Sequence, residues 1–315
     1  MKVFIKRSII ILLILFFFPL RIFSRELLSN DNKDLTAGLS ISPLLSAVEL
    51  SGNSTQLRYN SAALVGFGFF VSYDWIGCNA TFLHLCNSEQ KQSKSERYYL
   101  DVIMTDNVFF NRFSVNVIKG TSIASNLDDS RIYYPSMEVI KATDTFLYYF
   151  NDNISLKNIY LGNEKSKNRG GAFCAGFSSD FVSINNDSNI FDERVSDDFF
   201  DTNYNFSSVT FWSFSPLFGG KYVLLLGPYL NFSFGAELGP SIVFRSHVDE
   251  DQGTGKLTIF GLGKIIYMNS LTYTTEHFYI SIALDVESSP SARVNNDYLC
   301  KLSDLQCIFK AGVRF

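Results

Sequence analysis

The chain has 315 residues, of which 16% are aromatic and 18% are charged, and its formal net charge is −4. Lysine and arginine form no basic stripe, so the charge pattern gives no indication of nucleic-acid binding. Beyond the first residues, no apolar run reaches the length of about 20 that a membrane helix requires. The remaining classes are a soluble protein and a membrane β-barrel.

The chain begins with a segment that has the layout of a secretory signal peptide. An unbroken apolar run covers residues 9–18 and a small residue, Ser24, follows it. The run is preceded by three positive charges, Lys2, Lys6 and Arg7. This order is typical of exported proteins. We predict that residues 1–24 are cleaved and that residues 25–315 form a single domain, with an uncleaved anchor as the alternative.

Several later segments alternate apolar and polar residues with period two, which is typical of half-buried strands. They cover residues 65–75, 113–117, 173–181, 230–238 and 278–286. Their apolar faces are almost free of charge, while the opposite faces carry glycine, serine, asparagine and a few carboxylates. A soluble sandwich would expose a face rich in lysine and glutamate. The pattern therefore favours a wall between lipid and a polar lumen.

The connections between these segments differ in length, as in barrels that have long loops on one side and short turns on the other. We expect the long connections at residues 87–96, 122–134, 184–203, 246–255 and 288–304. We expect tight turns at residues 75–77, 106–107, 151–153, 227–228 and 268–270. The count of segments predicts an all-β fold, an antiparallel transmembrane barrel of about 12 strands within a range of 10–14. Residues 35–60 allow three readings: a strand, a loop or an inward-folded segment.

The last segment, residues 305–315, alternates in the same way and ends on Phe315. Phe309, Val313 and Phe315 are expected to face lipid, and Lys310 and Arg314 the lumen. A terminal aromatic residue resembles the signal that outer-membrane barrels present to their assembly machinery. We predict that this strand pairs with an early strand and closes the barrel. The expected partners are outer-membrane lipid and the assembly machinery.

Several short motifs occur in an order that resembles an uncharacterised family. The motifs are Leu57-Arg58-Tyr59-Asn60, Arg112-Phe113-Ser114, Tyr133 to Pro135, Tyr149-Phe150-Asn151, Ile154-Ser155-Leu156, and Glu164 to Lys167 ahead of Gly170-Gly171-Ala172-Phe173. Together they resemble the bacterial outer-membrane barrels grouped as domain of unknown function four-four-two-one. The chain departs from the family's glutamine and serine just before the glycines. The resemblance implies a barrel in the bacterial outer membrane and no catalytic residues.

The histidines decide how strongly the sequence favours a barrel hydrolase. His84 lies among apolar residues, His247 is close to Asp249, and His277 follows Glu276. A hydrolytic site needs such groups within hydrogen-bond reach, and chance supplies these neighbours in a chain rich in Asp. We predict a protein that is not an enzyme and has no cofactor. No metal site is predicted either, because the acidic segments lack the spacing of a calcium loop.

The five cysteines are an odd number for an exported chain, in which disulfides are allowed. Cys300 and Cys307 are close enough in sequence to form a disulfide at the approach to the last strand, which we predict. Cys174 is then expected to be a free thiol. The spacing of the cysteines does not match a zinc site.

The alternation also predicts which charged side chains face the lumen. The candidates are Asp74, Asp101, Arg112, Asp180, Glu237 and Asp285. Their excess of carboxylates would favour cations in an open lumen, whereas pairing among them would close it. The leading hypothesis is an outer-membrane barrel with a structural or narrow-channel role in passive transport. The alternatives are a surface adhesin or binding protein that acts through its long extracellular loops and, less favoured, a barrel hydrolase.

Overall fold

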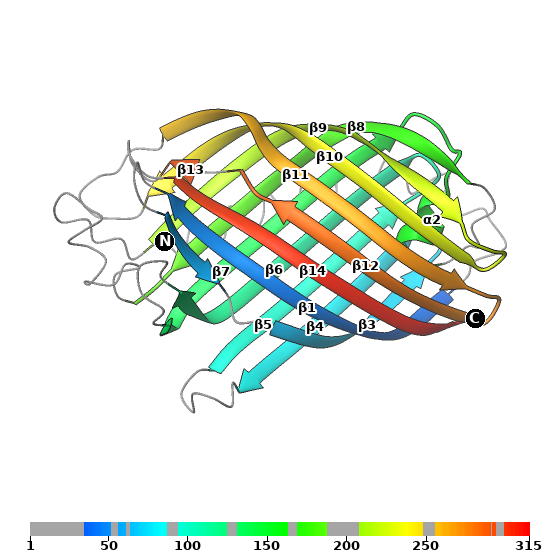
Figure 1. The fold of residues 1–315 in the computed structure, drawn as a ribbon, viewed down its shortest axis with the longest axis horizontal. Coiled ribbons are helices and arrows are strands. Elements are labelled where there is room, and N and C mark those ends of the chain that lie inside the picture. The colour runs from blue at the N-terminus through cyan, green and yellow to red at the C-terminus, as the bar shows by residue number, and fades with distance from the viewer. Residues whose placement is uncertain are drawn as a thin grey trace. The chain divides into compact units, whose positions relative to one another are not determined.

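The computed structural model of the protein describes residues 35–315 except residues 52–55, 61–63, 87–93, 125–130, 163–168, 188–207, 248–255, 291 and 294–298. The predicted signal peptide, residues 1–24, therefore lies outside the described residues. The described chain forms a closed antiparallel barrel of twelve strands (Figure 1). The fold class and the strand number predicted from the sequence are confirmed.

The barrel strands follow one another around the wall in chain order. They are β1 (Leu35–Ser51), β3 (Leu64–Tyr73), β4 (Ile76–Cys86), β5 (Lys94–Thr105), β6 (Phe109–Ala124), β7 (Arg131–Tyr149), β8 (Gly170–Asn185), β9 (Ser208–Leu225), β10 (Leu230–His247), β11 (Lys256–Thr274), β12 (Phe278–Ser288) and β14 (Leu299–Arg314). Two short strands, β2 (Gln56–Asn60) and β13 (Ala292–Arg293), and one helix, α2 (Leu156–Tyr160), complete the described elements.

The barrel closes where the last strand meets the first. β14 pairs with β12 on one side and with β1 on the other, from Thr36 opposite Arg314 to Ser51 opposite Leu299. The N–H of Phe315 donates to the carbonyl of Leu35 at 2.8 Å and completes this seam. Such closure leaves no free sheet edge between the first and last strands, as predicted for the terminal strand.

Residues 35–60 resolve into β1 and β2, and both strands belong to the wall. The first part of β1 pairs with β3 over residues 35–44, and its last part pairs with β2 over residues 47–51. β2 also pairs with the end of β6, at residues 58–60 and 122–124. β2 therefore joins β1 directly to β6 at one end of the barrel.

The connections sort into two ends, which we call the turn end and the loop end. The turn end carries Leu35, Phe315 and the described connections at residues 74–75, 106–108, 150–162, 226–229 and 275–277. The loop end carries the opposite ends of the strands, such as Asn185 and Ser208. Of the predicted tight turns, residues 268–270 lie inside β11, and residues 151–153 begin a longer connection that contains α2. Asn269 and Ser270 are residue types that are common in turns, but here they occupy opposite faces of that strand.

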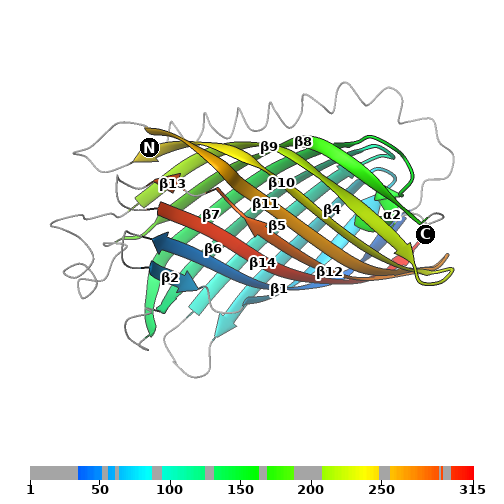
Figure 2. The same cartoon turned by 45° about the horizontal axis from the view of Figure 1, so that its top comes forward.

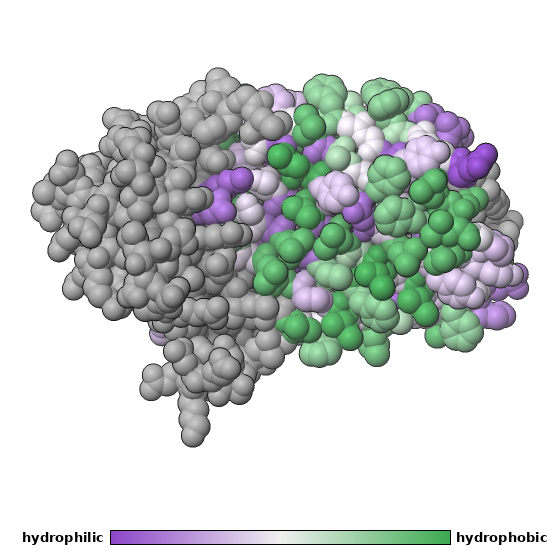
Figure 3. Space-filling view, viewed as in Figure 1, coloured by the Kyte–Doolittle hydropathy of each residue, from purple (hydrophilic) through white to green (hydrophobic). Residues whose placement is uncertain are grey.

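The two faces of the wall differ as the alternation predicts. Outward side chains such as Phe173, Phe218 and Phe309 are 77%, 60% and 37% exposed, while inward Cys174, Leu217 and Ile308 are buried. Figure 3 shows hydrophobic residues gathered over the described wall. At the terminus, Val313 and Phe315 face outward and Arg314 is buried, as predicted. Among the described residues, no helix is long and apolar enough to span a membrane.

A charge on the outward face is expected to be costly. Phe234 is 40% exposed and lies four residues from the start of β10, so the Phe234→Arg variant places a guanidinium well inside the lipid-facing band. Arginine at the bilayer midplane costs about 2–4 kcal/mol. We expect that loss in the free energy of unfolding in lipid vesicles, measured by urea titration. Phe234→Leu serves as the control, and an equal loss in both variants would contradict the assignment of the face.

Candidate functional site: the closed interior of the barrel

Five inward charges, three of them buried, cross the middle of the barrel and connect strands that are distant in sequence. The ammonium group of Lys264 donates to Asp180 at 2.6 Å and also to Glu287. That of Lys141 donates to Asp304 at 2.7 Å and lies 3.0 Å from Glu287. Lys264 and Asp180 are completely buried. We call these five residues the lysine network; it joins β7, β8, β11, β12 and β14.

A second group of charges is centred on Arg112, and we call it the arginine network. The Nε atom of Arg112 lies 2.8 Å from Asp101 on the neighbouring strand, and Nη1 lies 3.0 Å from Asp285 on β12. Nη2 donates to the hydroxyl of Tyr99 at 2.9 Å. A guanidinium presents several donors in a fixed plane, so one side chain ties β5 and β6 to a strand on the far side of the barrel.

Arg97 fixes the wall next to these networks. Its side chain is completely buried, and its guanidinium donates to the carbonyl of Ser42 and to Asn116 Oδ1, both at 3.1 Å. The same group lies 5.0 Å from the centre of the Tyr99 ring. These contacts connect β1, β5 and β6 and hold Tyr99 beside Arg112.

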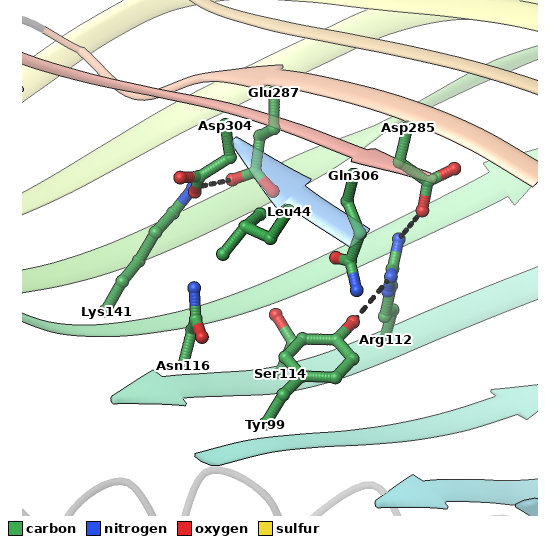
Figure 4. A pocket seen from close by; sticks show the side chains of 10 residues that line it. All are labelled: Leu44, Tyr99, Arg112, Ser114, Asn116, Lys141, Asp285, Glu287, Asp304 and Gln306. Atoms are coloured by element: carbon green, nitrogen blue, oxygen red, sulfur yellow. Dashed lines mark hydrogen bonds and ion pairs between the residues drawn. The ribbon is translucent and has the colours of Figure 1, made fainter. Parts of the chain in front are cut away.

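Residues of the two networks line a small, partly open cavity, in which the centre of a water molecule can move through about 30 Å³. Figure 4 shows Arg112 and Lys141 on one side of it and Asp285, Glu287 and Asp304 on the other. The remaining lining residues are Leu44, Tyr99, Ser114, Asn116 and Gln306. The ion pairs cross the cavity, so they narrow the interior at this level.

The turn end is filled by α2, which both ribbon views place at the end that carries the C-terminus (Figure 2). The hydroxyl of Ser155 caps the helix by accepting from the N–H of Asn158. Leu156, Ile159 and Leu161 are buried against inward side chains of four strands. Those side chains are Phe110, Leu147, Leu217, Val223 and Met268. The connection between β7 and β8 therefore folds back into the barrel as a plug.

Polar contacts attach α2 and Leu161 to strands around the mouth. Lys221 donates to the hydroxyl of Tyr160 at 2.6 Å. Asn231 donates to Asn158 Oδ1 at 2.8 Å, the ammonium group of Lys157 lies 2.9 Å from Asp74, and the hydroxyl of Ser72 donates to the carbonyl of Leu161 at 2.9 Å. Burial raises the pKa of Tyr160, and the nearby charge of Lys221 opposes that rise.

Gly162 ends the plug in a conformation that suits glycine. Its φ is +72°, in the left-handed region that residues with a Cβ atom rarely adopt. A Cβ atom at this position would lie 2.3 Å from the ring of Tyr279, which is itself buried. The chain can therefore turn here from α2 back toward the wall.

The structure brings most of the predicted lumen residues into the interior. Asp101, Arg112 and Asp285 meet in the arginine network, and Asp180 belongs to the lysine network. Glu237 is 3% exposed on β10 and lies outside both networks. Asp74 lies in the turn between β3 and β4 with a φ of 51°, and it contacts the plug.

The predicted excess of carboxylates in the lumen is wrong, because four inward bases were missed: Arg97, Lys141, Lys221 and Lys264. Lys310 and Arg314 were predicted to face the lumen, as was Arg112. With Glu287 and Asp304 also inside, acids and bases among the described inward residues are nearly equal in number. Alternation alone could have found Lys264, because it shares its face of β11 with Met268, Ser270 and Thr272.

The predicted disulfide between Cys300 and Cys307 is also wrong. Cys307 is a free thiol, and both residues belong to β14. Seven residues of one extended strand span about 23 Å at 3.3 Å per residue, far beyond the reach of a disulfide. Cys174 is a free, buried thiol, as expected.

The remaining site predictions are only partly covered by the described residues. Of the three histidines, only His277 has a described side chain, which is exposed in the last turn. The absence of an enzymatic activity therefore stays a prediction. Among the described side chains, no group of three or more His, Cys, Asp or Glu residues is arranged to hold a metal ion. Phe315 is 74% exposed, and its role as an assembly signal stays a prediction.

Comparison with solved structures finds chains that resemble this one in fold. The outer membrane protease OmpT from Escherichia coli has 10% identity and a TM-score of 0.41, covering 92% of this chain and 99% of that one. The translocator domain of the autotransporter NalP from Neisseria meningitidis has 11% identity and a TM-score of 0.36, covering 92% and 93%. The toluene transporter TodX from Pseudomonas putida has 7% identity and a TM-score of 0.29, covering 90% of each.

Comparison with curated proteins finds no match. A family model described as Domain of unknown function (DUF4421) matches residues 29–315, which include the whole barrel. The protein is therefore an outer-membrane β-barrel that belongs to the DUF4421 family.

Proposed function

We propose that the protein is a narrow outer-membrane channel that is closed at rest by α2. Short turns face the periplasm in barrels of this class, so the turn end and its plug are assigned to that side. The observation that carries the proposal is the attachment of the plug. α2 lies inside the mouth and is held there by the packing of its apolar side chains and by polar contacts such as that of Lys221 with Tyr160.

The wall is complete without α2, which favours a movable plug over a structural part of the barrel. All twelve strands pair with their neighbours around the ring, and none of these pairs includes a residue of the plug. A five-residue helix is too short to be stable on its own. The packing and polar contacts inside the mouth therefore hold α2 in place, and displacing it leaves the strand pairing intact.

The size and lining of the barrel support a narrow route. Barrels of about eight strands are filled by side chains, whereas those of about 16–18 strands enclose a wide aqueous channel. Twelve strands lie between these sizes. Above the plug, inward serine, threonine and charged side chains continue to the cavity and the two networks. A solute that enters from the turn end would pass the plug first and the ion pairs second.

The hydrogen bond between Lys221 and Tyr160 provides a test of this proposal. In planar bilayers we expect wild type to remain closed with brief openings, and Lys221→Met to open more often because Tyr160 loses its partner at 2.6 Å. Lys119→Met is the matched control, since Lys119 is 52% exposed and pairs with Glu138 away from the plug. An equal open fraction in all three proteins would contradict the assignment of the gate.

A further inference from the structure

The cavity between the two networks separates charges of opposite sign onto facing walls. Arg112 and Lys141 come from the adjacent strands β6 and β7. Asp285, Glu287 and Asp304 come from the adjacent strands β12 and β14. Figure 4 shows the three carboxylates reaching toward the two bases across the space. One wall of the cavity is therefore basic and the facing wall is acidic.

Both cavity bases are bridged to cavity acids. Arg112 lies 3.0 Å from Asp285, and Lys141 lies 2.7 Å from Asp304 and 3.0 Å from Glu287. The third acid, Glu287, also takes a bond from Lys264, which lies outside the lining. The Oδ1 atom of Asp285 is buried without a hydrogen-bond partner among the described residues. The acidic wall thus has one acceptor atom without a hydrogen-bond donor among the described residues, and a bound ligand could supply that donor.

We propose that this cavity binds a small zwitterion, a molecule that carries one ammonium and one carboxylate group. The carboxylate would contact Arg112 and the ammonium group would contact Asp285. The inference that such zwitterions are also the solutes that the channel carries rests on the proposed channel function. The binding site itself requires only the cavity and its walls.

The energetic reason is that a zwitterion replaces a bridge without changing the balance of charge. A solute with a single charge would pair with one wall and leave the opposite group buried and unpaired, which costs several kcal/mol. A neutral solute would separate both partners and neutralise neither. A zwitterion inserted between Arg112 and Asp285 gives the guanidinium a carboxylate and the carboxylate an ammonium group.

The polar lining adds the orientation that such a ligand needs. Ser114 and Asn116 lie on the basic wall beside Arg112, and Gln306 lies on the acidic wall. The amide of Gln306 donates to the hydroxyl of Ser42 at 2.7 Å, so its oxygen remains free to accept. The bridges cross the middle of the space, which restricts the site to short molecules that can lie between the walls.

Equilibrium dialysis of the refolded full chain with labelled glycine tests the binding site. We expect glycine to bind at least about tenfold more tightly than acetate or methylammonium, because a charge-assisted hydrogen bond contributes about 1.5–3 kcal/mol. Asp285→Asn keeps the shape of the side chain and removes its charge, and should weaken glycine binding by about tenfold or more. Lys119→Gln, on the outer face, should leave it unchanged. A difference in gel mobility between unheated and heated samples confirms that each variant is folded.

Swelling of liposomes in isotonic glycine separates this inference from the channel function. Binding of glycine without swelling would support the site and contradict the channel. Swelling without preferential binding of glycine would leave the channel in place and overturn the site. Glycine that binds equally to wild type and Asp285→Asn, or no better than acetate and methylammonium, would also overturn it.

Discussion

Lys264→Ala is expected to lower the free energy of unfolding by about 3–5 kcal/mol, because breaking the buried ion pair leaves Asp180 as an uncompensated charge. Lys264 is completely buried, and its ammonium group contacts both Asp180 and Glu287. Asp180 is also completely buried, so water cannot replace the lost partner. Urea unfolding in lipid vesicles, followed by the fluorescence of Trp75 and Trp212, measures the loss.

Lys119→Ala is the matched control for this experiment. Lys119 and Glu138 form an ion pair with 52% and 32% exposed side chains, and pairs of this kind contribute less than about 1 kcal/mol. The double variant Lys264→Met with Asp180→Asn should recover part of the loss, since it removes both members of one buried pair. Equal losses for the alanine variants of Lys264 and Lys119 would contradict the central place of the lysine network.

Replacing residues 154–161 by a glycine-serine linker is expected to have the largest effect on conductance. The linker keeps the connection between β7 and β8 but removes the buried side chains of Leu156, Ile159 and Tyr160 from the mouth. Wild type should show isolated openings, whereas the linker variant should carry a steady current in planar bilayers. The current should stay small, because the ion pairs of Arg112 and Lys141 still cross the barrel.

A second variant shows whether any current of the linker protein runs through the interior. Combining the linker with Asp285→Asn weakens one bridge across the cavity and should raise the current further. The same substitution in the plugged chain should have little effect. A linker protein that folds, inserts and carries no more current than wild type would mean that the networks alone close the barrel.

The sequence predicts the wall well because alternation reports directly on the two faces of a strand. Phe173 and Cys174 illustrate this, since the first is 77% exposed and the second is buried, as their positions in the pattern require. The terminal strand follows the same rule, and its pairing with β1 could be expected from the need to close the sheet. One face of each strand contacts lipid and the other faces the polar interior, so every residue of the strand is constrained.

The sequence does not predict which interior charges meet. Arg112 and Asp285 are 173 residues apart, and Lys141 and Asp304 are 163 apart. Such pairs depend on the curvature and the register of the whole barrel. Because Lys141 and Lys264 were missed, the expected lumen had an excess of carboxylates that the described interior does not have. The disulfide between Cys300 and Cys307 was wrongly predicted because the two residues are close in sequence, whereas on one extended strand they are far apart in space.

The sequence did not predict the plug, because the segment that forms its helix is short. Residues 151–153 resemble the beginning of a tight turn, and only five residues form α2. Its position depends on contacts with distant strands, such as that of Asn158 with Asn231. Gly162 and Ser155 are reasonable helix-ending and helix-capping residues, but neither indicates that the segment folds into the barrel.

A reversible crosslink between the plug and the wall tests the central claim most directly. Cysteines introduced by Asn158→Cys and Asn231→Cys, at side chains that are hydrogen-bonded at 2.8 Å, can be joined by a reducible thiol crosslinker after the five native cysteines are replaced by alanine. We predict that the crosslinked protein shows no openings in planar bilayers and that reduction of the linker restores them in the same molecules. Openings that persist in the crosslinked protein would contradict the assignment of α2 as the gate.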